Sequence, residues 1–171
     1  SPTEKGQAGA VTLGTCYDDW CLTQIAKKLN FDDDYNYFLN ASYNYRNLFN
    51  EETSFFHPKD KNGNFIMPFD YRYAGGQGGR EYYDENNGWI YRWDVAHRIS
   101  DLITLMGGKE QFIRNLDDLF TEPLGMEKFL FYRQFPDHTG NVGQFSMANE
   151  PSLHIPCLYT YAGKPWMTQQ R

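Results

Sequence analysis

The sequence predicts a mainly α-helical protein in which helices follow one another in pairs. Three observations support this fold class. Apolar residues recur at helical spacing in four stretches, residues that end helices follow those stretches, and the joints within each pair are short. Short joints favour antiparallel helix pairs, and a succession of such pairs along the chain fits part of a helical toroid. A chain of 171 residues is long enough for one domain with a real core.

The first predicted pair covers residues 13–49. Thr15 with Asp18 resembles a capping box at the start of the first helix, and Asn30 ends it. Asp32, Asp33 and Asp34 then begin the second helix, where the helix dipole favours acidic residues. The apolar positions of the first helix recur every four residues and predict its buried face: Leu13, Tyr17, Cys21, Ile25 and Leu29.

Residues 50–79 lack this periodicity. The turn signal at residues 59–64, followed by Phe65-Ile66-Met67, predicts one small hairpin. The glycine run at residues 75–79 does not follow a predicted strand and lacks phosphate-loop spacing. It therefore argues against nucleotide binding.

The second predicted pair consists of one helix at residues 93–106, stopped by Gly107-Gly108, and another at residues 112–120. Residues 121–148 lack a clear period and predict a long aromatic loop. A last helical element begins at Asn149-Glu150-Pro151, because proline suits the first helical position.

Charge and composition exclude several partners. The net charge is −6 without a basic patch, which argues against nucleic acid and against anionic membranes. No stretch approaches the roughly 18 apolar residues of a membrane span. The three cysteines lack metal-ligand spacing, and Cys16 and Cys21 are expected to be buried thiols. His97 and His154 are expected to be structural, and His57 and His138 to be exposed in loops.

The candidate functional stretch is residues 81–98, where Asp84 and Glu85 lie among aromatic side chains. Aromatic residues make up 18% of the chain, and flat rings can stack on the apolar faces of a sugar. A carboxyl group in such an apolar setting can act as an acid. The sequence therefore fits a sugar-binding cleft, but these residues alone favour a half-buried aromatic loop whose acids point into water. The rings concerned are Tyr82, Tyr83, Trp89, Tyr91 and Trp93.

A resemblance to a known family rests on several motifs in order along the chain. The most specific is Asn149-Glu150-Pro151-Ser152, followed by Leu158-Tyr159 and by residues 162–166. With these motifs the chain resembles the catalytic domain of glycoside hydrolase family 92, the calcium-dependent exo-acting α-mannosidases of bacteria. Weaker matches accompany it: residues 43–49, Pro68-Phe69-Asp70, Glu85 with Trp89, Tyr91 and Trp93, then Val95, His97 and Gly107-Gly108.

The resemblance implies an (α/α)6 toroid, of which residues 1–171 form a part, beside an N-terminal β-rich domain outside this chain. It implies inverting hydrolysis of terminal α-mannosidic bonds in glycans, with Glu85 as general acid. It also implies calcium, with Glu150 as a ligand because calcium prefers oxygen. Substrate contacts are expected from Trp89, Tyr91, Trp93 and Asn149, and the implied location is periplasmic or secreted.

Three departures from the family pattern concern the same region. The usual Glu-Gly-Asn-Ala-Trp-Gln-Tyr reads here as residues 85–91 with Asn86 and Gly88, and the usual Val-Pro-His-Asp ends in Arg98. The expected linkage is α1,2, although Met147-Ala148 stand where α1,2-specific members carry a His-Glu pair. The Asp-rich segment with the catalytic base is expected beyond Arg171, so the isolated piece is expected to be inactive. The alternatives are a non-catalytic carbohydrate-binding or helical scaffold module and a helical interaction domain.

Overall fold

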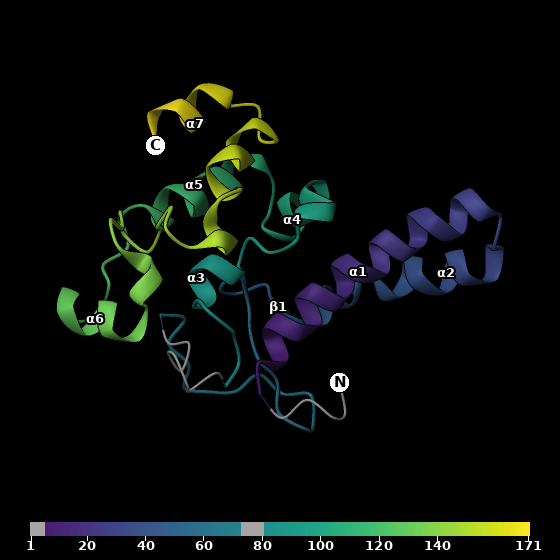
Figure 1. The fold of residues 1–171 in the computed structure, drawn as a ribbon, viewed down its shortest axis with the longest axis horizontal. Helices are drawn as coiled ribbons and strands as arrows, with labels where there is room; N and C mark the ends of the chain where they lie inside the picture. Colours follow the sequence, from purple (N-terminus) through teal and green to yellow (C-terminus); the bar gives the residue numbers. More distant parts are fainter. Residues whose placement is uncertain (1–5, 73–80) are drawn as a thin grey trace.

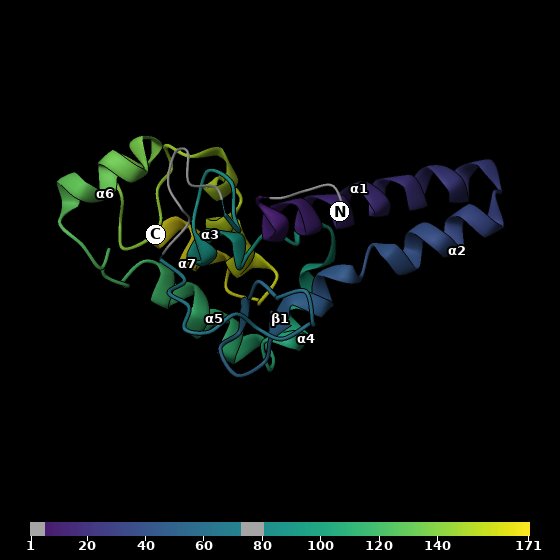
Figure 2. The ribbon, with the colours of Figure 1, turned by 90° about the horizontal axis from the view of Figure 1, so that it is seen from below.

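The computed structural model describes residues 6–72 and 81–171, and the glycine run at 75–79 lies outside these ranges. The chain is mainly helical, which confirms the predicted fold class. Figure 1 shows a body of short helices from which one long helical hairpin projects. Figure 2 shows the same arrangement from below, with α6 at the opposite end of the body from the hairpin. In the described part of the chain, no helix is both long and apolar enough to cross a membrane.

The hairpin consists of α1 (Ala8–Leu29) and α2 (Asp32–Ala41). Asn30 ends α1 in the left-handed conformation (φ 59°), and the three aspartates occupy the first turn of α2. The short joint and the antiparallel pair are thus as predicted. The predicted start is wrong, because α1 begins at Ala8 and the expected capping box at Thr15 lies inside the helix.

The predicted buried face of α1 is also wrong over most of its length. A spacing of four residues exceeds the 3.6 residues of one turn, so the row drifts around the helix and Leu29 ends far from the side of Leu13. Tyr17, Ile25 and Leu29 are exposed. The buried positions are spaced by four, three, seven and three residues: Gly9, Leu13, Cys16, Thr23 and Ala26. Of the cysteines, Cys16 is buried, Cys21 is half-buried and Cys157 is exposed.

A 3-10 helix, η1 (Asn44–Leu48), follows α2, so the predicted second helix stops earlier than expected. Strands β1 (Phe49–Asn50) and β2 (Phe55–Phe56) then pair antiparallel, with Phe49 opposite Phe56. The predicted hairpin at 59–67 is reduced to a single bridge between Lys59 and Phe65. Its turn is held by the Asp60 carboxylate, which accepts the backbone N–H groups of Asn62 and Asn64.

The middle of the chain forms α3 (Gly88–Tyr91), η2 (Ala96–Arg98), α4 (Ile99–Leu105) and α5 (Lys109–Leu119). The helix predicted from residue 93 therefore begins later, after a 3-10 turn. Its end is as predicted: Gly107 has φ 88°, and the N–H of Gly108 reaches back to the carbonyl of Ile103 at 2.8 Å.

The last third contains α6 (Lys128–Gln134), η3 (Pro136–His138), η4 (Glu150–Ser152), η5 (Ile155–Thr160) and α7 (Pro165–Gln170). The long loop expected at 121–148 thus contains a helix of seven residues. That helix buries a single side chain, Phe131, and its apolar residues 129–132 form one continuous run, so they show no helical period.

The main core lies where α3, α4, α5 and η5 meet the start of α1. A second, smaller cluster is formed by Phe131 and Phe135 with Leu124 and Tyr132. The largest side chains with no more than 2% exposure in the main core are Trp93, Tyr45, Tyr83, Tyr159, Phe56 and Phe112.

Candidate active site

Two segments that carry candidate acids meet through a pair of buried amides. Nδ2 of Asn86 donates to Oδ1 of Asn149 at 2.6 Å, although 63 residues separate them in the sequence. Both asparagines are fully buried, whereas their neighbours Glu85 and Glu150 are exposed. The amide pair therefore anchors the two segments to each other and leaves both carboxylates at the surface.

A second amide pair fixes the start of α3. The side chain of Asn87 accepts the N–H of Trp89 and so caps the helix, while its Nδ2 donates to Oε1 of Gln144 at 2.9 Å. Gln144 in turn donates to the carbonyl of Pro123 at 2.7 Å. Buried amides that are hydrogen-bonded in this way hold a loop in one conformation, because breaking any of the bonds leaves a buried polar group unpaired.

Gly88 lies in close backbone packing at the same place. Its N–H donates to the carbonyl of Tyr71 at 2.8 Å. A Cβ here would lie 3.1 Å from the ring and the carbonyl of Tyr71 and from the hydroxyl of Tyr83, so a larger residue would require these neighbours to shift.

Of the predicted sugar platforms, Trp89 is the one with an accessible setting. It is half-buried, meets Phe55 edge-on at 5.0 Å between ring centroids, and lines a pocket of about 360 Å³. The other residues lining this pocket are Phe69, Asp70, Tyr71, Arg72 and Glu122.

Tyr91 and Trp93 lie in the core. The ring of Tyr91 stacks on Tyr83 at 5.2 Å, and burial raises the pKa of Tyr91. Trp93 has no exposed surface and meets Phe112 edge-on at 5.3 Å. Neither ring offers an open face in this structure, so their placement supports a packing role.

Asp94 is a further candidate for a catalytic carboxyl group, and the sequence analysis did not identify it. Burial raises the pKa of Asp94, while the nearby His154 works in the opposite direction. Nε2 of His154 lies 3.1 Å from the carbonyl oxygen of Trp93, which is the partner expected of a structural histidine. Asp94 follows directly on the aromatic run, but a single acid there carries no distinctive spacing. The asparagine doublet at 86 and 87 is the signal that could have revealed the amide network.

The two histidines expected in exposed loops are buried instead. His57 packs against the rings of Phe65, Phe69 and Tyr71, with Nδ1 2.7 Å from the hydroxyl of Tyr71. His138 lies among Phe131 and Phe135, and burial lowers its pKa to about 4. A neutral imidazole surrounded by aromatic rings can be buried in a core. The residue type and its position in a loop do not predict such surroundings.

The described residues do not form a metal site by themselves. Residues 6–72 and 81–171 contain no cluster of three or more His, Cys, Asp or Glu side chains suited to a metal. Glu150 has an exposed carboxylate, whereas Oδ1 of Asn149 already accepts from Asn86. Calcium takes six to eight oxygens. Glu150 can provide part of that set, and backbone carbonyls, amides, water or other parts of the protein would have to provide the rest.

Comparison with known proteins gives one consistent answer. A profile of the family described as "Glycosyl hydrolase family 92 catalytic domain" matches residues 1–171. Among curated proteins, an "Uncharacterized secreted glycosidase" from Arthroderma benhamiae is 28% identical over 181 residues, which cover 94% of this chain and 20% of the relative.

Solved structures agree. The family GH92 α-mannosidase BT3965 from Bacteroides thetaiotaomicron, in complex with mannoimidazole, matches with a TM-score of 0.82 and 32% identity over 99% of this chain and 23% of its own. The inverting GH92 mannosidase BT2199 from the same species matches with a TM-score of 0.76 and 34% identity over 96% of this chain and 22% of its own. The chain thus spans about a fifth of the length of these relatives.

Proposed function

The chain belongs to the glycosyl hydrolase family 92 catalytic domain family, and we propose from this that its protein hydrolyses terminal α-mannosidic bonds of glycans with inversion. Its helical pairs form part of the α/α toroid of that catalytic domain. The observation that supports a site in this chain is the hydrogen bond between Asn86 and Asn149, because it joins the segments that carry Glu85 and Glu150.

We assign Glu85 the role of general acid. In an inverting reaction, a carboxylic acid gives its proton to the leaving oxygen while water attacks the anomeric carbon from the opposite face. A second carboxylate takes the proton of that water, and the two carboxyl groups lie roughly 6.5–9.5 Å apart. Glu85 is exposed and can reach a substrate, and its position is held because Asn86 and Asn87, directly after it, are fixed by buried hydrogen bonds.

Trp89 is the proposed stacking surface for the sugar. It is the second residue of α3, and it lines the pocket together with Tyr71 and Arg72. Asn149 is assigned to the floor of the site, since its Nδ2 is buried without a partner in the described structure. Tyr91 and Trp93 support the site from the core.

Calcium belongs to the same proposal. When bound, the ion would add a fixed positive charge that orients sugar hydroxyl groups. Glu150 is the proposed protein ligand, because its carboxylate is exposed and its backbone follows the anchored Asn149. Removal of calcium with a chelator is expected to lower kcat/KM, and Glu150→Gln is expected to weaken calcium binding measured by calorimetry.

The test of Glu85 uses two leaving groups. For Glu85→Gln we expect kcat/KM on a mannobiose to fall roughly 100- to 10,000-fold, the usual contribution of a general acid. With 2,4-dinitrophenyl α-mannoside the loss is expected to be much smaller, because this leaving group needs no proton. Glu81→Gln, an exposed neighbour, is the control. Equal losses on both substrates would remove Glu85 from the acid role, and Asp94→Asn measured in parallel would identify the alternative carboxyl group.

Stereochemistry and linkage are measured on the unaltered protein. Proton NMR during hydrolysis is expected to show β-mannose first, as inversion of an α-bond requires. A panel of α1,2-, α1,3-, α1,4- and α1,6-linked mannobioses gives the linkage, for which we propose α1,2. Saturable mannoside binding without turnover in the complete protein would instead identify a non-catalytic carbohydrate-binding module.

We place the protein outside the cytoplasm, in the periplasm or secreted. The supporting observation is that the relative from Arthroderma benhamiae is described as a secreted glycosidase. Cell fractionation with an antibody to this chain tests the location, and recovery in the cytoplasm alone would contradict it.

A further inference from the structure

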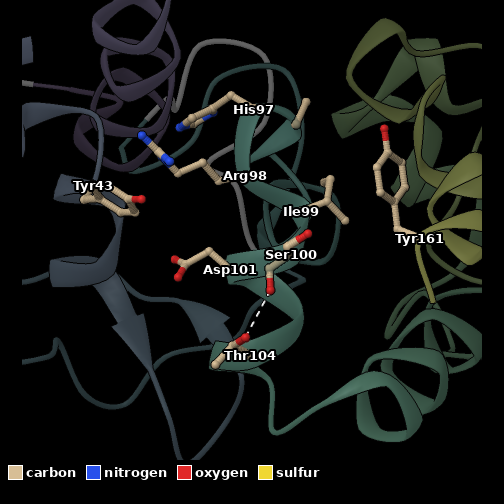
Figure 3. Close-up of a pocket in the computed structure, with 9 residues that line it drawn as sticks. Tyr43, His97, Arg98, Ile99, Ser100, Asp101, Thr104 and Tyr161 are labelled. Carbon is tan, nitrogen blue, oxygen red and sulfur yellow. Dashed lines mark hydrogen bonds between the residues drawn. The ribbon is translucent and has the colours of Figure 1, made fainter. Parts of the chain in front are cut away.

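A second concave feature lies at the start of α4. This pocket has a volume of about 560 Å³ and shares no lining residue with the candidate active site. Figure 3 shows His97, Arg98 and Asp101 on the side of Tyr43, with Tyr161 across from Ile99. The pocket is thus bordered by polar side chains of one short segment and by two tyrosines from distant parts of the chain.

The single carboxylate of this pocket is already compensated. Asp101 accepts hydrogen bonds from Nε and Nη2 of Arg46 and from the hydroxyl of Tyr45. Burial disfavours the charge of Asp101, but the hydrogen bonds from Arg46 and Tyr45, together with the positive charges of Arg46 and Arg98, outweigh it and lower its pKa. Asp101 is thus bonded directly to Arg46, and Arg98 is a second positive charge near the same carboxylate.

Arg98 is a second guanidinium without such a partner. Among the described residues no carboxylate forms an ion pair with it, and its one side-chain hydrogen bond is from Nη2 to the hydroxyl of Ser42 at 3.1 Å. Its Nε is buried and has no hydrogen-bond partner within residues 6–72 and 81–171. Its Cζ lies 3.8 Å above the ring of Tyr43, which fixes the plane of the guanidinium. A permanently charged group with spare donors is thus held rigidly at the pocket.

His97 adds no charge that would compensate Arg98. Its Nε2 lies 3.3 Å from the carbonyl oxygen of Ser42, which places the ring hydrogen on Nε2 and leaves Nδ1 as an acceptor. Nδ1 is buried and has no hydrogen-bond partner among the described residues. Burial lowers the pKa of His97, the carbonyl of Ser42 opposes this, and the charge of Arg98 lowers the pKa further. The ring is therefore neutral near pH 7. Arg98 at the pocket and Arg46 beside it together exceed the one lining carboxylate, Asp101, by one positive charge.

We propose that this pocket binds an oxyanion group, a carboxylate, sulfate or phosphate, against the guanidinium of Arg98. The planar fork of a guanidinium matches the two oxygens of such a group, and the stacking on Tyr43 holds the fork in place. A cation would be repelled by Arg98, and a neutral ligand would leave its charge uncompensated. This inference does not depend on the proposed hydrolysis.

The test is a calorimetric titration of the protein with sulfate, inorganic phosphate, glucuronate and methyl glucoside, with sodium chloride keeping the ionic strength constant. We expect saturable binding of the anions and none of methyl glucoside. Saturation by the inorganic anions supports a site for the free ions, and saturation by glucuronate alone supports one for an acidic sugar. Binding of methyl glucoside as tight as that of glucuronate, or no saturation by any anion, would overturn the proposal.

Variants assign the binding to Arg98. Arg98→Gln is expected to weaken it at least about tenfold, because a charged hydrogen bond is lost. Arg98→Asp, which restores the usual family residue, is expected to abolish it. Arg133→Gln removes the same charge from an exposed position on α6 and is the matched control. If Arg98→Gln does not fold, Arg98→Lys keeps the charge but lacks the fork, and it too is expected to bind more weakly. Equal affinity in the Arg98 and Arg133 variants contradicts the assignment.

Discussion

The helical body and the projecting α1–α2 hairpin differ in how far they bury their apolar side chains. In the body, Trp93, Leu102 and Leu116 are fully buried. In the hairpin, α2 buries no residue, and Ile25, Leu29 and Tyr37 are 55%, 54% and 69% exposed. Apolar spacing therefore identifies a helix in both regions, but it reports a buried core only in the body. Packing stabilises the body, whereas the outer hairpin depends on local helix propensity and on its ends.

The largest predicted effect is on the body core. Trp93→Ala removes a fully buried ring that meets Phe112, and we expect a loss of about 3–5 kcal/mol in the free energy of unfolding. Tyr37→Ala, on the exposed side of the hairpin, is expected to change it by less than about 0.5 kcal/mol. Urea unfolding followed by circular dichroism measures both. Similar losses for the two variants would show that the hairpin is packed as tightly as the body.

The second prediction concerns pH and the smaller cluster at the far end of the body. His138 is fully buried beside Phe131 and Phe135, and both ring nitrogens lack partners in the described structure. Burial lowers the pKa of His138 from 6.5 to about 4, against the weaker opposing effect of Asp137. Below pH 6.5 the unfolded chain binds a proton that the folded chain excludes. Stability is therefore expected to fall as the pH drops from 6.5 toward 4, by about 2–3 kcal/mol.

His138→Leu separates this effect from general acid denaturation. The variant places an apolar side chain among the phenylalanines and has no group at this position that can bind a proton. Its free energy of unfolding is therefore expected to fall less steeply over the same pH range. Urea titrations at pH 7, 5.5 and 4.5 give the slopes. Identical slopes for the two proteins would mean that His138 is protonated in the folded state as easily as in the unfolded one.

Sequence reasoning reached the fold class and the ends of several helices because those features depend on local chemistry. Asn30 and Gly107 end helices through their own backbone conformations, and Asp32 begins one through its charge. The buried face of α1 was not predictable in the same way, since it depends on which side the body covers. For the site, the sequence indicated Glu85, Asn149 and Glu150, and the hydrogen bond of Asn149 with Asn86 became visible only in three dimensions.

The third prediction compares glycines in the two regions. Gly143, in the body, has φ 57°, and a Cβ there would lie 2.5 Å from the carbonyl carbon of Phe120 and 2.6 Å from the carbonyl oxygen of Leu119. Gly143→Ala is expected to cost about 2 kcal/mol, because alanine disfavours positive φ and the neighbouring backbone must move. Thermal unfolding measures the loss. An unchanged midpoint would show that the loop after α6 rearranges freely.

The fourth prediction is a small effect of the opposite sign. Gly14 lies in the middle of α1, and a Cβ there would meet nothing within 4 Å. Gly14→Ala is therefore expected to stabilise the protein by about 0.5–1 kcal/mol, because alanine loses less backbone freedom in a helix than glycine does. The same thermal unfolding experiment gives the sign. If α1 owes its stability to local propensity, the midpoint rises without any new contact. A lower midpoint would mean that another part of the protein occupies the surface beside Gly14. Packing would then stabilise the hairpin as it stabilises the body.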